Sequence, residues 1–229
     1  MPSTGRSVME RRLAAPDMLA RVRKYRSGPG LKIMQRKLLG ALFAIFGPML
    51  WAGAAAAKPA GTVIGLSGSC TDGGRALHPG DTVQIGDTLE VPAGGSLKVR
   101  MVDGSMISVS SGTSITVASY DSAGSGRGAK LLLTQGLVRV TSVIRPFEVS
   151  TAVGTAQVGS DSADWFVKAE AGSAQVGVLA GAVDLTNILT GVSVSIPVHW
   201  GTRLEAGRAP VPPRRWTQME FNAVTRLTE

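Results

Sequence analysis

Residues 77–117 read LHPGDTVQIGDTLEVPAGGSLKVRMVDGSMISVSSGTSITV, and this stretch decides the fold. Within it, Leu97, Val99 and Met101 alternate with charged residues, and similar short runs are separated by glycine together with Asp or Ser. Successive side chains on a strand point to opposite faces of the sheet. The alternation therefore predicts short strands that each bury one face.

The same alternation extends beyond this stretch in both directions. Further apolar runs are Ile107 and Val109, Ile115 and Val117, Val138 and Val140, Phe147 and Val149, Val176 and Val178, Val183 and Leu185, and Val192, Val194 and Ile196. Turn signals between them include Pro79-Gly80-Asp81, Ile85-Gly86-Asp87, Asp103-Gly104-Ser105, Gln135-Gly136 and Gly181. We therefore predict an all-β fold in a single domain.

The strand spacing fits a sandwich, a roll or a β-solenoid equally well. Glycine-rich turns favour a solenoid-like or roll arrangement, although no strict repeat length is present. After the strands, residues 208–229 begin with a proline-rich linker. Trp216, Met219, Ala223, Val224 and Leu227 then follow helical spacing. This stripe predicts a short C-terminal helix that packs on the domain and covers a sheet edge.

The N-terminal residues 1–57 read as a basic extension followed by a secretory signal peptide. An apolar h-region at residues 38–51 precedes the small-residue run Ala55-Ala56-Ala57, so cleavage is predicted after Ala57. The alternative is an uncleaved helix anchored in the inner membrane. Both readings place the following residues in the periplasm or outside the cell. Translation starts at Met1 or, as the compact signal after it suggests, at Met34.

The net charge of +8 does not indicate a nucleic-acid partner. Residues 1–57 contain ten of the 24 Lys and Arg residues and two of the 16 acidic residues. The remaining chain is thus formally neutral and offers no basic surface for a phosphate backbone.

No pattern for catalysis, metal or a cofactor stands out. His78 and His199 are far apart in sequence, and Cys70 is the only cysteine, expected to be buried. Asp161 and Asp164 could form a carboxylate pair, but their glycine-rich context favours turn and strand-edge positions. We therefore expect no enzyme, no metal site and no cofactor.

Three side chains are candidate partner contacts. Trp200 and His199 follow Pro197 closely, where the chain is expected to be exposed, and Trp216 opens the predicted helix. Large aromatic side chains often anchor protein interfaces. Trp165, by contrast, lies in an apolar strand and is expected in the core.

Residues 61–207 resemble the FecR periplasmic domain family. The resemblance rests on GTVIGLSGSC, the two Gly-Asp turns, the Asp103-Gly104-Ser105 hairpin, and the units at Gly136 and Gly181. Many members have an Arg-Gly-Thr turn where this chain has Gly159-Ser160-Asp161. The founding type also has a sizeable cytoplasmic region that binds a sigma factor, whereas this chain has only its short N-terminal extension.

The resemblance implies a non-enzymatic sensory or interaction domain that binds a protein or another envelope component, in signalling or envelope organisation. Two alternatives stay open. One is a structural module that binds peptidoglycan or a surface polymer. The other is a membrane-anchored regulator of a sigma factor with a minimal cytoplasmic tail.

Overall fold

The computed structural model describes residues 58–121, 128–143, 146–158 and 162–229. These residues belong to the second of two compact units, Gly53–Glu229. The predicted signal peptide, its cleavage point and the translation start lie outside the described residues, as does Asp161. Across the described ranges, no helix combines the length and apolar character needed to cross a membrane.

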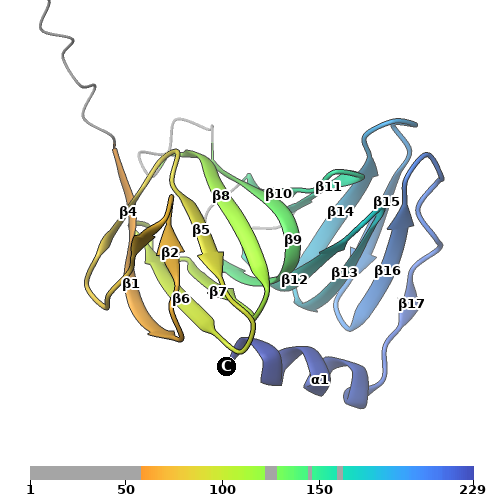
Figure 1. Cartoon of the computed structure of the whole chain (residues 1–229). Helices are drawn as coiled ribbons and strands as arrows, with labels where there is room; N and C mark the ends of the chain where they lie inside the picture. The colour runs from red at the N-terminus through yellow and green to blue at the C-terminus, as the bar shows by residue number, and fades with distance from the viewer. Residues whose placement is uncertain (1–57, 122–127, 144–145, 159–161) are drawn as a thin grey trace, which may run out of the picture. The chain divides into compact units, whose positions relative to one another are not determined.

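Strands dominate the described part of the chain, and one helix ends it, which confirms the predicted fold class (Figure 1). The strands are β1 (Pro59–Ser67), β2 (Thr71–Asp72), β3 (Arg75–Ala76), β4 (Thr82–Gln84), β5 (Thr88–Val91), β6 (Ser96–Met101), β7 (Met106–Val109), β8 (Thr113–Tyr120), β9 (Ala129–Ser142), β10 (Phe147–Ser150), β11 (Gly154–Val158), β12 (Ala163–Glu170), β13 (Ser173–Ala180), β14 (Ala182–Asn187), β15 (Ser193–Pro197), β16 (Trp200–Glu205) and β17 (Arg214–Arg215). The helix is α1 (Gln218–Thr228).

The strands form two layers that share β9. Layer A has the order β4-β1-β6-β7-β9-β12-β13-β16-β17. Layer B has the order β3-β2-β5-β8-β9-β10-β11-β14-β15. Among these pairs only β9 and β10 run parallel. The layers are therefore built almost entirely from antiparallel neighbours.

A bend at Gly136 lets β9 serve both layers. Residues 129–135 pair with β8 in layer B, and Gly136–Ser142 pair with β12 in layer A. Gly136 has a φ of 94°, and a Cβ there would lie 2.2 Å from the Thr113 hydroxyl oxygen. Only glycine fits both conditions. The turn predicted at Gln135-Gly136 is thus wrong, because the glycine bends a continuous strand instead of ending it.

The strand topology repeats once along the chain. In the first half, β5 pairs with β8, β6 with β7, and the two halves of β9 pair with β8 and β7. In the second half, β11 pairs with β14, β12 with β13, and β15 and β16 pair with β14 and β13. Six successive strand segments are therefore paired in the same way in both halves, although the sequence shows no strict repeat.

The core lies between the two layers and contains the predicted alternating residues. Leu97, Val138, Val176 and Val183 are each fully buried, and residues from both layers join one continuous apolar cluster. One predicted core residue is misplaced: Val192 is 45% exposed because it lies in the turn before β15.

The two Gly-Asp turns have the same hydrogen-bonding pattern. In the first, Asp81 N donates to His78 O, and the Asp81 carboxylate accepts from His78 N at 2.9 Å. In the second, Asp87 N donates to Gln84 O, and its carboxylate accepts from Gln84 N at 2.7 Å. The glycine before each Asp has a positive φ. These requirements explain why both turns read Gly-Asp.

Each Gly-Asp turn also forms backbone hydrogen bonds with a strand next to a β-bulge. Gly80 N donates to Val63 O, and Val63 N donates to Asp81 O. Val117 makes the equivalent pair of bonds with Gly86 and Asp87. The register of β1 shifts just after Val63, and that of β8 shifts just after Val117. The turns therefore supply hydrogen-bond partners to backbone N–H and C=O groups that, because of these β-bulges, do not pair with the neighbouring strand.

The helix α1 begins after the N-cap Thr217 and packs on the outer face of layer A. Phe221 and Val224 belong to one apolar cluster with Trp216 and with Phe166 and Leu137 of β12 and β9. The predicted apolar stripe is wrong in part, because Met219 and Leu227 are 81% and 57% exposed. The prediction that the helix covers a sheet edge is also wrong, because α1 packs on a face of layer A, and the short β17 pairs with β16 at the edge.

Candidate functional site

An uncharged segment runs along one edge of the second half of the domain. Between Asp184 and Arg203 the sequence contains no Asp, Glu, Lys or Arg. This segment forms the end of β14, all of β15 and the beginning of β16. We call residues 186–202 the uncharged edge.

Strand β15 is the last strand of layer B. It pairs with β14 from Ser193↔Thr186 to Pro197↔Ala182, and no other described strand pairs with it. Edge strands of globular proteins are usually protected by charged residues, bulges or a covering element. Of these devices, the described part of the chain gives β15 only a terminal proline, Pro197, and pairs it on one side only, with β14.

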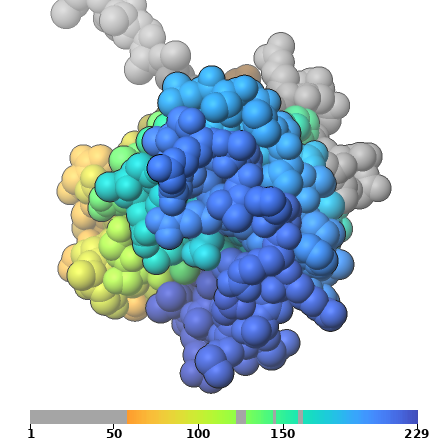
Figure 2. Space-filling view, turned by 90° about the vertical axis from the view of Figure 1, so that its right-hand side faces the viewer, coloured from red at the N-terminus to blue at the C-terminus, as the bar shows by residue number. Residues whose placement is uncertain are grey.

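Exposed apolar side chains flank β15 at both ends. Ile188, Leu189 and Val192 are 58%, 73% and 45% exposed, while Val198 and Trp200 are 43% and 38% exposed. Figure 2 shows the side of the domain to which β14 to β17 and the C-terminal segment contribute. Contiguous exposed apolar residues are typical of sites that bind other proteins.

The turn before β15 is held in shape by Asn187, which is fully buried. Its side-chain oxygen accepts from Leu189 N at 2.7 Å and from Thr190 N at 2.9 Å. Its amide nitrogen donates to Arg208 O at 2.6 Å. The exposed Ile188 and Leu189 therefore sit on a turn that hydrogen bonds fix to the body of the domain.

His199 makes the corner between β15 and β16. Its φ of 65° is positive, which is uncommon for a residue with a side chain. The His199 N–H donates to Val178 O at 2.8 Å, and its carbonyl accepts from Trp216 N at 3.0 Å. Its ring meets Phe221 edge-on at 6.1 Å. His199 thus links the uncharged edge to the C-terminal segment.

Trp216 packs over Gly201 on the outer face of layer A, next to Phe166, which packs over Gly177. A Cβ on Gly201 would lie 2.3 Å from the Trp216 ring, and a Cβ on Gly177 would lie 2.4 Å from the Phe166 ring. The Trp216 ring centroid lies 5.3 Å from that of Phe166 and 5.4 Å from that of Phe221. Because the side chain is only 8% exposed, it packs within the domain.

The three residues that were predicted to contact a partner therefore differ in how exposed they are. Trp200 and His199 lie on the uncharged edge, whereas Trp216 has little surface to offer a partner. The prediction that they contact a partner stays a prediction. Trp165 is confirmed as a core residue, with no exposed surface. Sequence reasoning missed the edge itself, although the absence of charge from residues 186–202 could have indicated it.

Three other candidates from the sequence, Cys70, Asp164 and His78, lie in the described part of the chain. Cys70 is buried as predicted, and burial raises the pKa of its thiol. Asp164 forms a bidentate ion pair with Arg139, at 2.8 and 2.7 Å, and this hydrogen bonding raises the pKa of Arg139. The His78 ring lies near Asp81 on the surface. Within the described ranges, no group of three or more His, Cys, Asp and Glu side chains could hold a metal ion.

A family model described as FecR protein matches residues 87–184. No curated protein sequence matches the chain. Two crystal structures, each provisionally described as an anti-sigma factor from Parabacteroides distasonis, have a similar chain path. The first is 17% identical with a TM-score of 0.49, and the match covers 59% of this chain and 63% of that one. The second is 16% identical with a TM-score of 0.48, and covers 59% and 62%. Each match spans less than two thirds of the solved chain.

Proposed function

Because this chain contains a FecR-family domain, matched over residues 87–184, we propose that it is an exported, non-enzymatic sensory or regulatory domain that binds a protein partner at the uncharged edge. The observation that carries the proposal is the free strand β15 with exposed apolar residues at both ends. The periplasmic side of the inner membrane is the proposed location.

An extended segment of the partner would add to layer B alongside β15. In this mode of recognition, backbone hydrogen bonds supply affinity and side-chain contacts supply specificity. Leu189 and Trp200, near opposite ends of the strand, would contact apolar side chains of the partner. Since the edge carries no charge and residues 58–229 are formally neutral, such binding would depend little on salt.

Lysine substitutions on the edge test this proposal. Leu189→Lys places a charge on an exposed apolar residue of the edge, and Met219→Lys does the same on α1, where the side chain is 81% exposed. Both variants should fold normally. We expect Leu189→Lys to lose the partner that the wild-type protein retains from envelope extracts, and Met219→Lys to keep it. Equal retention by both variants would refute binding at the edge.

Export is tested separately by mapping the N-terminus of the protein recovered from its native envelope. A start at Lys58 would support the secreted or periplasmic form. A longer N-terminus that includes residues 38–57 would support the membrane-anchored alternative, in which residues before the anchor could reach a sigma factor. A protein recovered only from the cytoplasm would contradict export.

One observation favours the second candidate function, binding of a surface polymer. A row of hydroxyl groups crosses the outer face of layer B in register, interrupted by Leu132. Its members are Thr88, Thr116, Ser150, Thr155, Thr186 and Ser193. Adjacent strands space such groups about 4.8 Å apart, which could match a repeating polysaccharide. Sedimentation with purified peptidoglycan sacculi distinguishes this candidate, because the edge proposal predicts that the protein stays in the supernatant.

A further inference from the structure

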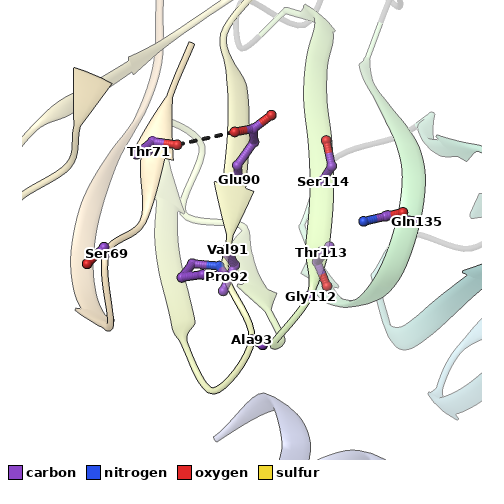
Figure 3. Close-up of a pocket in the computed structure, with 10 residues that line it drawn as sticks. All are labelled: Ser69, Thr71, Glu90, Val91, Pro92, Ala93, Gly112, Thr113, Ser114 and Gln135. Atoms are coloured by element: carbon purple, nitrogen blue, oxygen red, sulfur yellow. Dashed lines mark hydrogen bonds between the residues drawn. The ribbon is translucent and has the colours of Figure 1, made fainter. Parts of the chain in front are cut away.

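A cleft opens on the outer face of layer B, in the half of the domain that does not contain the uncharged edge. Figure 3 shows its lining residues, which come from β2, β5, β8 and β9, from the segment before β2, and from the turns after β5 and before β8. Its volume is about 450 Å³, within the range of about 300–1,000 Å³ that is usual for ligand pockets. Three strands, β10, β11 and β14, separate its last lining strand, β9, from β15 in the layer.

Four polar side chains form one row across the floor of the cleft. The register aligns Thr71 with Glu90, Glu90 with Ser114, and Ser114 with Gln135. The row exists because the neighbours of Glu90 in β5, Leu89 and Val91, point into the core. Pro92, Ala93 and Gly112 line the same cleft beside this row. A ligand would therefore meet hydrogen-bonding groups and a small apolar surface.

The carboxylate of Glu90 is the only charged group in the lining. Its one hydrogen bond within the described structure is from the Thr71 hydroxyl, at 3.4 Å. Glu148 on the same face of layer B differs, because Lys130 lies 2.7 Å from its carboxylate and Ser150 donates to it at 2.7 Å. Among the described residues, Glu148 is thus paired with a lysine, whereas no lysine or arginine forms an ion pair with Glu90.

We propose that the cleft binds the guanidinium group of an arginine side chain presented by a partner polypeptide. A guanidinium can donate two parallel hydrogen bonds to one carboxylate, here that of Glu90. Its other N–H groups can donate to the Ser114 hydroxyl, which is next to Glu90 in the row, and to the Gln135 amide oxygen, which is next to Ser114. The flat side of the group would lie on Pro92.

The site is distinct from the uncharged edge and can be tested whether or not the edge binds a partner. The probe is a blocked tripeptide, acetyl-Gly-Arg-Gly-amide, titrated into the isotopically labelled protein produced from the full-length gene. Backbone amide shifts report the location of binding. Because the cleft is open to water, we expect millimolar affinity, with saturable shifts at Glu90, Ser114 and Gln135.

Two matched peptides define the chemistry. The citrulline analogue has the shape of arginine without its charge, and we expect it to bind at least tenfold more weakly. The lysine analogue keeps the charge but lacks the planar fork, and we also expect weaker binding. Equal binding of citrulline would show a neutral polar site, and equal binding of lysine would show a general cation site; either result overturns the assignment.

Two variants define the residue. Glu90→Gln keeps the shape of this exposed side chain and should weaken arginine binding at least tenfold while leaving the thermal midpoint unchanged. Asp184→Asn removes another exposed carboxylate from the same face, outside the cleft, and should have no effect on binding. Equal loss in both variants would indicate non-specific attraction. Unsaturable shifts in the wild-type protein, or shifts that do not involve the cleft, would refute the site.

Discussion

Replacing Gly201 with alanine should loosen the C-terminal helix without unfolding the domain. The added Cβ would lie 2.3 Å from Cε2 and 2.4 Å from Nε1 of Trp216, so the ring must move or the strand must shift. Gly201 does not have a positive φ, so the effect would come from the clash alone. Overpacking of this kind usually costs about 1–3 kcal/mol of stability.

The effect should concentrate in α1. This helix has 11 residues, and helices of that length are marginal in water unless they pack on other elements. Phe221 contacts Trp216, so displacement of the tryptophan removes part of the surface on which the helix docks. Hydrogen exchange of residues 218–228 should therefore accelerate more than exchange in β12 or β13.

Gly65→Ala is the matched control. Gly65 also lies in layer A, but a Cβ there would have no atom within 4 Å. Because alanine restricts the unfolded chain more than glycine does, this variant should be neutral or slightly stabilising, by up to about 1 kcal/mol. The reasoning would be refuted if both variants had the same free energy of unfolding in urea and the same exchange rates in α1.

Three further predictions follow from buried or paired polar groups. Burial, with the hydrogen bond to Asp103, raises the pKa of Tyr120 well above its ordinary value. Residues 58–229, in which Tyr120 is the one tyrosine, should therefore show no phenolate absorbance at about pH 11, where a free tyrosine is largely ionised, and early ionisation would contradict this contact. Burial acts to raise the pKa of Glu148, but hydrogen bonds from Lys130 and Ser150 outweigh it and lower that pKa. The ionised Glu148 should therefore stabilise the fold above the unfolded pKa, near 4.5, and this contribution should be lost as the pH falls through the lower folded pKa. Glu148→Gln should accordingly lose less thermal stability on acidification than the wild type. An unchanged loss would count against the pairing. Asn187→Ala leaves the backbone N–H groups of Leu189 and Thr190 without their acceptor, so it should cost about 1–3 kcal/mol in urea unfolding and speed hydrogen exchange at residues 188–191, and unaltered exchange there would argue against its role in the turn.

Strand positions could be predicted because each strand buries one face. Leu97 and Val99 both lie in the core because their spacing matches the period of a strand. The same rule could not distinguish the bend at Gly136 from a turn. A positive φ is required in both cases, and only the pairing of β9 with two different strands shows that the chain continues.

Features formed by distant segments could not be predicted. The neighbouring places of Trp216 and Phe166 depend on Gly201 and Gly177, which have no visible role until β13 and β16 lie side by side. The helical stripe was wrong in part, because Trp216 lies before the helix and α1 packs against it through Phe221, which the stripe did not include. The Glu90 cleft draws its four polar side chains from four strands, and the sequence gives no sign of their alignment.

The central claim, that the uncharged edge is the partner-binding surface, is tested most directly by photo-cross-linking in the native envelope. A photoreactive amino acid is placed in turn at the exposed positions Leu189, Val192 and Trp200 of the edge, and at Met219 and Ile64 elsewhere on the domain. The account predicts one common cross-linked protein from the three edge positions and none from the two others. The same product from all five positions, or products only from Met219 or Ile64, would contradict it.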